Sequence, residues 1–275
     1  MLTLEQKQLI QEKAKAIRVH IVKAVTAAKS GHPGGSLSIA DVMSLLYFQE
    51  MNVNPNEPKD PNRDRFVLSK GHAAPALYAT LAEKGFFPTE ELLNLRKIDH
   101  ILQGHPDMKY IPGVDMSTGS LGQGISAACG MALAGKIDGS SYRVYSVLGD
   151  GELEEGQVWE AAMFAAHYKL SNLTAFVDFN GLQIDGDITK VMSPLPIDEK
   201  FKAFGWHVIV VDGHDLDSLH AAVTEAKATT DKPTMVIMNT VKGKGVQAME
   251  GQAGWHGKAP SQEECDKFVA ELLEV

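Results

Sequence analysis

Short apolar runs alternate along this chain with longer segments of helical periodicity. Five apolar runs have the length and composition of buried strands, and they cover residues 66–69, 142–148, 173–179, 207–212 and 234–240. Apolar side chains recur at helical spacing over residues 4–28, 38–50, 74–84, 89–98, 125–136, 157–169, 197–204, 215–229 and 261–273. This alternation predicts an α/β fold, a parallel sheet of about five strands with helices on both faces. We expect Ser38 and Asp215 to cap the helices that they precede.

The composition is that of an ordinary globular protein, with 44% apolar and 22% charged residues among 275. We expect a single α/β domain over residues 1–275, because this length is enough for one large core and no linker or repeat divides it. The net charge of −9 argues against nucleic-acid binding. Cys129 and Cys265 show neither disulfide nor zinc spacing, and no apolar run is long enough for a membrane span. A cytoplasmic protein is therefore expected.

Two polar residues follow predicted strands directly. The run at 142–148 leads into Gly149-Asp150-Gly151, and the run at 173–179 leads into Asn180-Gly181. The carboxyl ends of neighbouring parallel strands lie side by side, and ligands bind at that edge. A carboxylate and an amide oxygen suit Mg²⁺ or Ca²⁺, and a cation with few protein ligands completes its shell with phosphate oxygens. The pattern indicates a metal-bound diphosphate, although Gly, Asp and Asn are also common in plain turns.

Four histidines lie in loops rich in glycine or proline: His32, His72, His105 and His256. A single loop histidine is usually structural, but four such loops favour a role in binding or in proton transfer near neutral pH. They lack the spacing of a zinc site. The segment 119–124 (GSLGQG) precedes a helix whose first amides should be free to bind an anion. The G-x-G-x-x-A pattern at 122–127 lacks a preceding strand, so a dinucleotide fingerprint is rejected.

These motifs together resemble a known family. Gly149-Asp150-Gly151, followed about thirty residues later by Asn180, resembles the diphosphate motif of thiamine diphosphate enzymes. Seven motifs in order resemble the N-terminal half of transketolase over essentially the whole chain: SGHPGG, SKGHAAPALY, GHPD, TGSLGQG, GDGELEEG, DFNGLQIDG and WHGKAP.

The resemblance implies a role for each matching residue, with thiamine diphosphate and Mg²⁺ (or Ca²⁺) as cofactors. The implied metal ligands are Asp150, Asn180 and the backbone carbonyl of Leu182. The implied cofactor contacts are His72, Gly119, Ser120, Leu121, Asp150, Gly151, Asn180 and His256. The implied catalytic residues, which bind the ketose, are His32, His105 and His256. Glu155 resembles an acid at the dimer interface, and Ser120 stands where many transketolases have proline.

The implied activity is the transfer of a two-carbon ketol unit between a ketose phosphate and an aldose phosphate. The family's pyrimidine-binding domain is not represented in the sequence, so we expect the N-terminal subunit of a split transketolase with a C-terminal partner subunit in an α₂β₂ assembly. Two alternatives stay open. One is a related thiamine diphosphate enzyme, such as 1-deoxyxylulose-5-phosphate synthase or a 2-oxoacid dehydrogenase α subunit. The other is a cofactor-binding module without catalysis. Neither the sugar nor the partner follows from the sequence.

Overall fold

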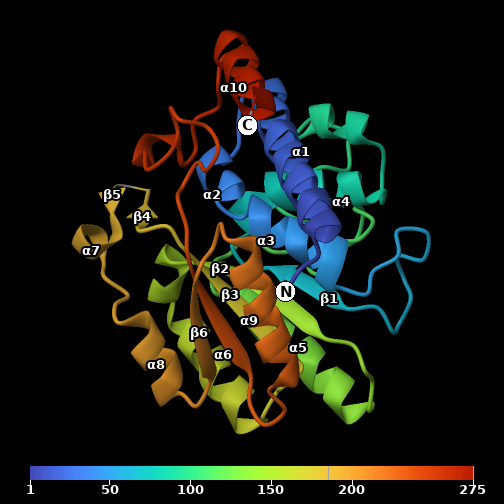
Figure 1. Cartoon of the computed structure of the whole chain (residues 1–275), viewed down its shortest axis with the longest axis vertical. Coiled ribbons are helices and arrows are strands. Elements are labelled where there is room, and N and C mark those ends of the chain that lie inside the picture. Colours follow the sequence, from blue (N-terminus) through green and yellow to red (C-terminus); the bar gives the residue numbers. More distant parts are fainter. Residues whose placement is uncertain (185, 275) are drawn as a thin grey trace.

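The computed structural model describes residues 1–184 and 186–274 and contains a five-stranded parallel sheet (Figure 1). The strands lie in the order β1-β2-β3-β7-β6. Their bounds are β1 Arg65–Leu68, β2 Val144–Gly149, β3 Leu173–Phe179, β6 His207–Asp212 and β7 Thr234–Asn239. The predicted sheet is confirmed, and two of its strands begin and end at the predicted residues. The last strand in sequence, β7, lies between β3 and β6, which leaves β6 at an edge.

Helices cover both faces of the sheet, because alternate strand residues point to opposite sides. Phe66, Tyr145 and Phe176 point to one face, where they join a core shared with α1, α3, α4, α9 and α10. Val67, Ala175 and Val177 point to the other face, toward α5, α6 and α8. The helix bounds are α1 Leu4–Ala28, α2 Pro33–Leu37, α3 Ala40–Leu45, α4 Ala74–Lys84, α5 Gln123–Ile137, α6 Gly156–His167, α7 Ile188–Val191, α8 Ile197–Ala203, α9 Leu216–Ala228 and α10 Gln262–Glu274.

The segment after α1 differs from its prediction. Residues 33–37, expected in a loop, form the buried helix α2, because tertiary packing offsets the poor helix propensity of its two glycines. Ser38 is not the N-cap of the following helix, which is Ile39, but the C-cap of α2. Its hydroxyl donates to the backbone oxygen of Gly35 and to the carboxylate of Asp178, which lies 140 residues later. The single helix expected at 38–50 consists of α3 and a π-helical turn over Leu46–Glu50.

Other predictions hold with small changes. Asp215 caps α9 through its side chain, as expected. The helix expected at 89–98 is a 3₁₀ segment over Thr89–Asn94. The strands β4 Leu182–Gln183 and β5 Gly186–Asp187 form a short antiparallel pair that the sequence pattern did not predict, because two residues are too few to show a period. Both cysteines are free and buried in helices.

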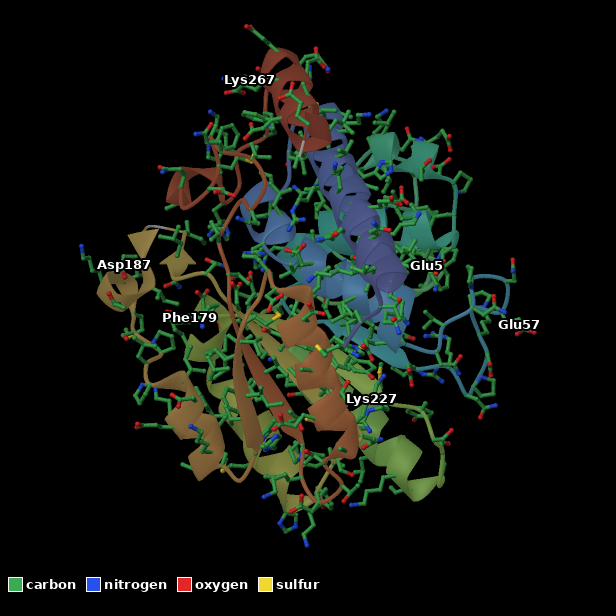
Figure 2. All side chains as sticks on the ribbon, viewed as in Figure 1. Glu5, Glu57, Phe179, Asp187, Lys227 and Lys267 are labelled. Carbon is green, nitrogen blue, oxygen red and sulfur yellow. The ribbon has the colours of Figure 1, made fainter. Side chains whose placement is uncertain are left out.

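Most charged side chains lie at the surface, with Glu57, Asp187 and Lys267 exposed at the margin of the molecule (Figure 2). The β4–β5 pair and α7 lie together at one side, next to the carboxyl end of β3 (Figure 1). Among the described residues, no helix is both long enough and apolar enough to cross a bilayer.

Candidate cofactor site

A cavity of about 380 Å³ opens at the carboxyl edge of the sheet. Strands β1, β2, β3 and β7 all deliver residues to this edge, because the chain leaves each strand there. Asp150 follows β2, Asn180 follows β3, Lys70 follows β1 and Lys242 follows β7. This volume lies within the range of small-molecule sites. The predicted adjacency of Asp150 and Asn180 agrees with this arrangement.

Most of the predicted site residues line this one cavity: His32, His72, His105, Gly119, Leu121, Asp150, Gly151, Asn180, Leu182 and His256. Two do not. Ser120 is exposed and lies outside the lining, and Glu155 lines a neighbouring cavity that shares Leu121 and Gly151 with the first. The structure therefore gathers residues from seven separate motifs into one place, although they are spread over more than 200 positions of the sequence.

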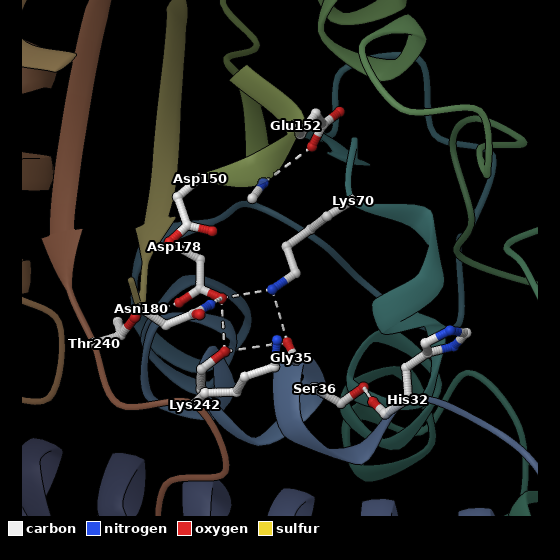
Figure 3. A network of polar contacts seen from close by, with 12 residues as sticks. His32, Gly35, Ser36, Lys70, Asp150, Glu152, Asp178, Asn180, Thr240 and Lys242 are labelled. Carbon is white, nitrogen blue, oxygen red and sulfur yellow. Dashed lines mark hydrogen bonds and ion pairs between the residues drawn. The ribbon is translucent and has the colours of Figure 1, made fainter. Parts of the chain in front are cut away.

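Asp150 is buried beside the turn that carries Asn180 (Figure 3). Its carboxylate accepts hydrogen bonds from the backbone amides of Gly151, at 2.9 Å, and Gly181, at 2.7 Å. Burial, followed by the negative charge of Asp178, raises the pKa of Asp150 to about 6. A divalent cation at this carboxylate would favour its ionised form and so act in the opposite direction.

The predicted metal ligands fit a hard cation that is shared with a diphosphate. Asp150 and Asn180 offer a carboxylate and an amide oxygen, and the carbonyl oxygen of Leu182 accepts from the ammonium of Lys242 at 3.1 Å. Among residues 1–184 and 186–274, no group of three or more His, Cys, Asp and Glu side chains could enclose a metal. A cation held here would therefore need oxygens from its ligand, as Mg²⁺ commonly does.

Two lysines that the sequence analysis missed supply positive charge. Lys70 is almost fully buried and pairs with Asp178 at 2.6 Å. The ammonium of Lys242 also donates to Nδ1 of His256 at 3.1 Å, and burial, followed by the charge of Lys70, lowers the pKa of Lys242 to about 8. Lysine in a loop usually indicates a solvated surface, so neither position carried a signal on its own. Because Asp178 pairs with Lys70, Lys242 is the lysine of the two that adds positive charge at the cavity.

The histidine rings of His32, His72 and His256 form a cluster, with centroids 5.2–5.3 Å apart in each pair. Burial, followed by the charge of Arg96, lowers the pKa of His32 to about 4. Burial, followed by the charge of Lys242, lowers the pKa of His256 to about 3. The pKa of His72 is also lowered, chiefly by burial. All three rings are therefore neutral near pH 7, and Nδ1 of His32 is buried without a hydrogen-bond partner among the described residues.

His105 reaches the cavity across a glycine turn. A Cβ atom on Gly119, whose φ is +152°, would lie 3.0 Å from Cγ of His105, so a side chain there would displace the ring. Arg96 joins the two histidine loops. Its guanidinium donates to the hydroxyl of Ser30, in the loop of His32, at 2.7 Å. It also packs against Gly104, in the loop of His105, where an added Cβ atom would lie only 3.1–3.4 Å from the guanidinium.

One expectation about the helix after this turn is wrong. Two backbone amides at the start of α5 are not free to bind an anion. The amide of Gly122 donates to the carboxylate of Glu152, and the amide of Ile125 donates to the hydroxyl of Ser69. The buried carboxylate of Glu152 also accepts from Ser69 and from the amide of Gly149. The carboxylate of Glu152 therefore already interacts with the positive, N-terminal end of α5. Neighbouring strand ends supply these partners, which sequence spacing does not reveal.

A larger groove of about 590 Å³ lies elsewhere, lined by α1 and the loop at Lys244 and Gly245. Its buried groups are already paired: Arg18 binds Asp41 at 2.5 Å, and Asp41 accepts from His214 at 2.7 Å. None of the predicted site residues lines this groove. The cavity at the sheet edge is therefore the candidate site.

Comparison with known families agrees with the geometry. The family model described as transketolase, thiamine diphosphate binding domain, matches residues 9–272. The chain belongs to the transketolase family. This match favours a transketolase domain over the related thiamine diphosphate enzymes considered from the sequence.

Individual transketolases are similar over the whole chain. The 6-deoxy-6-sulfo-D-fructose transketolase subunit SqwG of Clostridium sp. (strain MSTE9) is 48% identical over 98% of this chain and 98% of its own length. An apulose-4-phosphate transketolase subunit of Phocaeicola vulgatus is 42% identical over 98% of this chain and 95% of its own. The transketolase structure from Campylobacter jejuni superposes with a TM-score of 0.91 at 34% identity, covering 96% of this chain and 43% of that one. The chain spans about two fifths of the long transketolases that it matches.

Proposed function

We propose that this chain is the cofactor-binding subunit of a transketolase, which transfers a two-carbon ketol unit from a ketose to an aldose. The observation that carries this proposal is the convergence of the predicted diphosphate, metal and histidine residues on one cavity at the carboxyl edge of the sheet. SqwG and the apulose-4-phosphate transketolase subunit, which match this chain over nearly their whole lengths, support the same conclusion. We also propose a single domain over residues 1–275 and a cytoplasmic location.

The metal and diphosphate would bind at the strand ends. Asp150, Asn180 and the carbonyl of Leu182 would hold Mg²⁺ or Ca²⁺, with Gly151 and the Gly119–Leu121 turn beside the diphosphate. Lys242 would add positive charge at the same end. Thiamine diphosphate, when bound, supplies the electron sink for breaking and making the carbon–carbon bond. The protein's part at this end is to hold and orient the cofactor.

The histidines would act on the sugar. Because burial lowers the pKa values of His32, His105 and His256, their rings are neutral and can accept a proton from a sugar hydroxyl. Nδ1 of His32 has no partner in the part of the chain that the structure describes, which leaves hydrogen-bonding capacity for a ligand. We propose that these three residues orient the ketose and move protons to and from its hydroxyl groups, and that His72 contacts the cofactor.

A partner chain would complete the site. Among residues 1–184 and 186–274, the carboxylates that line the cavity are already engaged, Asp150 with two backbone amides and Glu152 with Ser69, Gly122 and Gly149. Neither is free to activate the aminopyrimidine ring of the cofactor, so that group would come from a C-terminal transketolase subunit. We propose an α₂β₂ assembly in which Glu155 lies at the interface. Such an obligate interface should bury on the order of 2,000 Å² or more.

The experiment compares this chain alone, the partner alone and their mixture. Native mass measurement should show an α₂β₂ complex, and only the mixture should transfer ketol units with thiamine diphosphate and Mg²⁺. Fructose 6-phosphate and 6-deoxy-6-sulfo-D-fructose are the donors to compare, because the similarity to SqwG makes the second a specific candidate. Full ketol transfer by this chain alone would contradict the split enzyme. Cofactor binding by a folded mixture without transfer to any aldose would favour a binding module.

A further inference from the structure

The side chain of Asp178 accepts hydrogen bonds from four segments of the chain, next to the candidate metal ligands (Figure 3). It lies on β3, two residues before Asn180, and is fully buried. Its Oδ2 accepts from Lys70 at 2.6 Å, Ser38 at 2.7 Å and Nδ2 of Asn180 at 3.0 Å. Its Oδ1 accepts from the hydroxyl of Thr240 at 2.5 Å. None of the cofactor or metal roles predicted from the sequence falls on this residue.

The contact with Asn180 decides which way its amide faces. A side-chain amide has a donor end and an acceptor end, and a carboxylate surrounded by donors offers only acceptor atoms. Nδ2 of Asn180 must therefore face Asp178, which turns Oδ1 away from it. Oδ1 accepts from the amide of Leu182 at 3.2 Å and keeps a second acceptor site. In the reversed orientation, the amide oxygen of Asn180 would face the carboxylate oxygen of Asp178, and two buried acceptors would lie side by side without a proton between them.

The same turn is held from its other side by Asp150. The amide of Gly181, the residue after Asn180, donates to Oδ2 of Asp150 at 2.7 Å. Asp178 and Asp150 thus fix the side chain and the backbone of one turn from two neighbouring strands, whose residues Gly149 and Asp178 lie opposite each other in the sheet. The oxygen of Asn180 and the carboxylate of Asp150 are held together before any ligand binds.

We propose that Asp178 is a positioning residue, which orients the amide of Asn180 so that its oxygen is presented to the cation of the diphosphate. This inference rests on the proposed function, because it assumes a cation between Asp150 and Asn180. Lys70 balances the buried charge of Asp178, and Ser38 and Thr240 complete its hydrogen bonds. Partners of this kind, which orient a metal ligand without touching the metal, commonly change metal affinity about 10–100-fold when they are removed.

The test uses variants that separate the acceptor from the charge. Lys70→Met is the reference, because Asp178 keeps its hydrogen bonds to Ser38, Thr240 and Asn180. Lys70→Met with Asp178→Leu removes the acceptor and replaces the ion pair by apolar groups, an exchange that buried pairs often tolerate. Lys70→Met with Asp178→Asn restores an oxygen that can accept from Asn180. Thr240→Val is the matched control, since it removes a donor to the same carboxylate without touching Asn180.

Calorimetry of the assembled enzyme measures thiamine diphosphate binding with Mg²⁺ in excess. We expect the Leu variant to bind about 10–100-fold more weakly than Lys70→Met, and the Asn variant to recover most of this loss. Thr240→Val should stay close to the unmodified enzyme. Equal affinity of the Leu variant and Lys70→Met would overturn the inference, as would a loss of the same size in Thr240→Val.

A second measurement needs no cofactor, and its first reading uses the unmodified chain. In the chain labelled with ¹⁵N-asparagine, the side-chain amide proton that Asn180 donates to Asp178 should exchange slowly with solvent, and faster in the Leu variant. Fast exchange in the unmodified chain would overturn the inference. If instead the unmodified assembly binds no thiamine diphosphate, the proposed function fails, while the exchange rates still report on the orientation of Asn180.

Discussion

The two ends of the candidate cavity are built in different ways. At the metal end, Asp150, Asp178 and Asn180 hold one another through hydrogen bonds from backbone and side chains. At the histidine end, the rings of His32, His72 and His256 lie edge to face or tilted, with centroids 5.2–5.3 Å apart. Nδ1 of His32 is buried, with no partner in residues 1–184 and 186–274. One end is charged and cross-linked by hydrogen bonds, and the other has neutral rings that are held mainly by packing.

This difference fits the two roles that we propose for the cavity. A cation and a diphosphate need fixed oxygens and charges, which are costly to leave unpaired inside a protein, so the metal end is joined to four strand ends. Histidines that accept protons from a substrate need free hydrogen-bonding atoms and a pKa low enough to keep the ring neutral. Burial and the positive charges of Arg96, Lys242 and Lys70 lower the pKa values in this way. The metal end should therefore determine cofactor affinity, and the histidine end should determine rate.

The largest effect is expected at the metal end. Asp150→Ala should abolish Mg²⁺-dependent binding of thiamine diphosphate in the assembled enzyme, because a direct ligand is lost and even indirect partners change affinity about 10–100-fold. Calorimetry measures it, with Asp198→Ala, a partly exposed residue outside the cavity, as the control. Unchanged affinity in Asp150→Ala would remove the metal assignment and with it the contrast between the two ends.

The histidine end should give the complementary result. His32→Ala, His105→Ala and His256→Ala should each lower ketol transfer by about 10²–10⁴, as expected for lost proton-transfer groups, with little change in thermal stability. His32→Ala and His105→Ala should leave cofactor affinity nearly intact. Steady-state kinetics and calorimetry measure both properties, and the solvent-facing His100→Ala is the control. Near-normal turnover in all three variants would mean that these loops are structural.

Arg96 gives a smaller and more specific test. Arg96→Met removes the hydrogen bond to Ser30 and a positive charge that helps to lower the pKa values of His32 and His105. Both pKa values should rise, and turnover should fall about 10-fold or more because the two loops lose their common anchor. NMR titration of the ring protons checks the pKa values, with the exposed Lys97→Met as the control. Unchanged pKa values would show that burial alone neutralises these rings.

The smallest effect concerns stability against pH. The folded-state pKa values of His32 and His256, about 4 and about 3, lie below the ordinary 6.5. As pH falls below 6.5, the unfolded chain binds protons that the folded chain does not, so these residues lower the free energy of unfolding. Asp150, whose pKa is raised to about 6, acts in the opposite direction over the same range.

Urea denaturation between pH 4.5 and 7 separates these contributions. In His32→Gln and His256→Gln, the free energy of unfolding should fall less steeply with decreasing pH than in the unmodified chain. The change in slope should be less than about 1.4 kcal/mol per pH unit, because solvent screens these partly exposed rings. The same slope in the variants and the unmodified chain would contradict neutral histidines in the folded protein. His207→Gln, at the exposed edge of the sheet, is the control.

The sequence by itself determined the alternation of strands and helices and the position of the candidate site. The β3 and β6 strands match their predicted bounds, because uninterrupted apolar runs between polar turns are a local signal. Asp150 and Asn180 could be placed together because each follows a strand of a parallel sheet. The histidine loops were visible as motifs, and the structure brings all four rings to the cavity.

Only the tertiary structure decided which polar groups are partners. Lys70 and Ser38 meet Asp178 across 108 and 140 residues of sequence, and Glu152 occupies amides of α5 that were expected to be free. Such pairs depend on where separate strand ends lie relative to one another. The spacing of residues along the chain does not reveal these positions. The orientation of the Asn180 amide follows from those long-range contacts, because a local sequence specifies an amide but not which of its ends faces the interior.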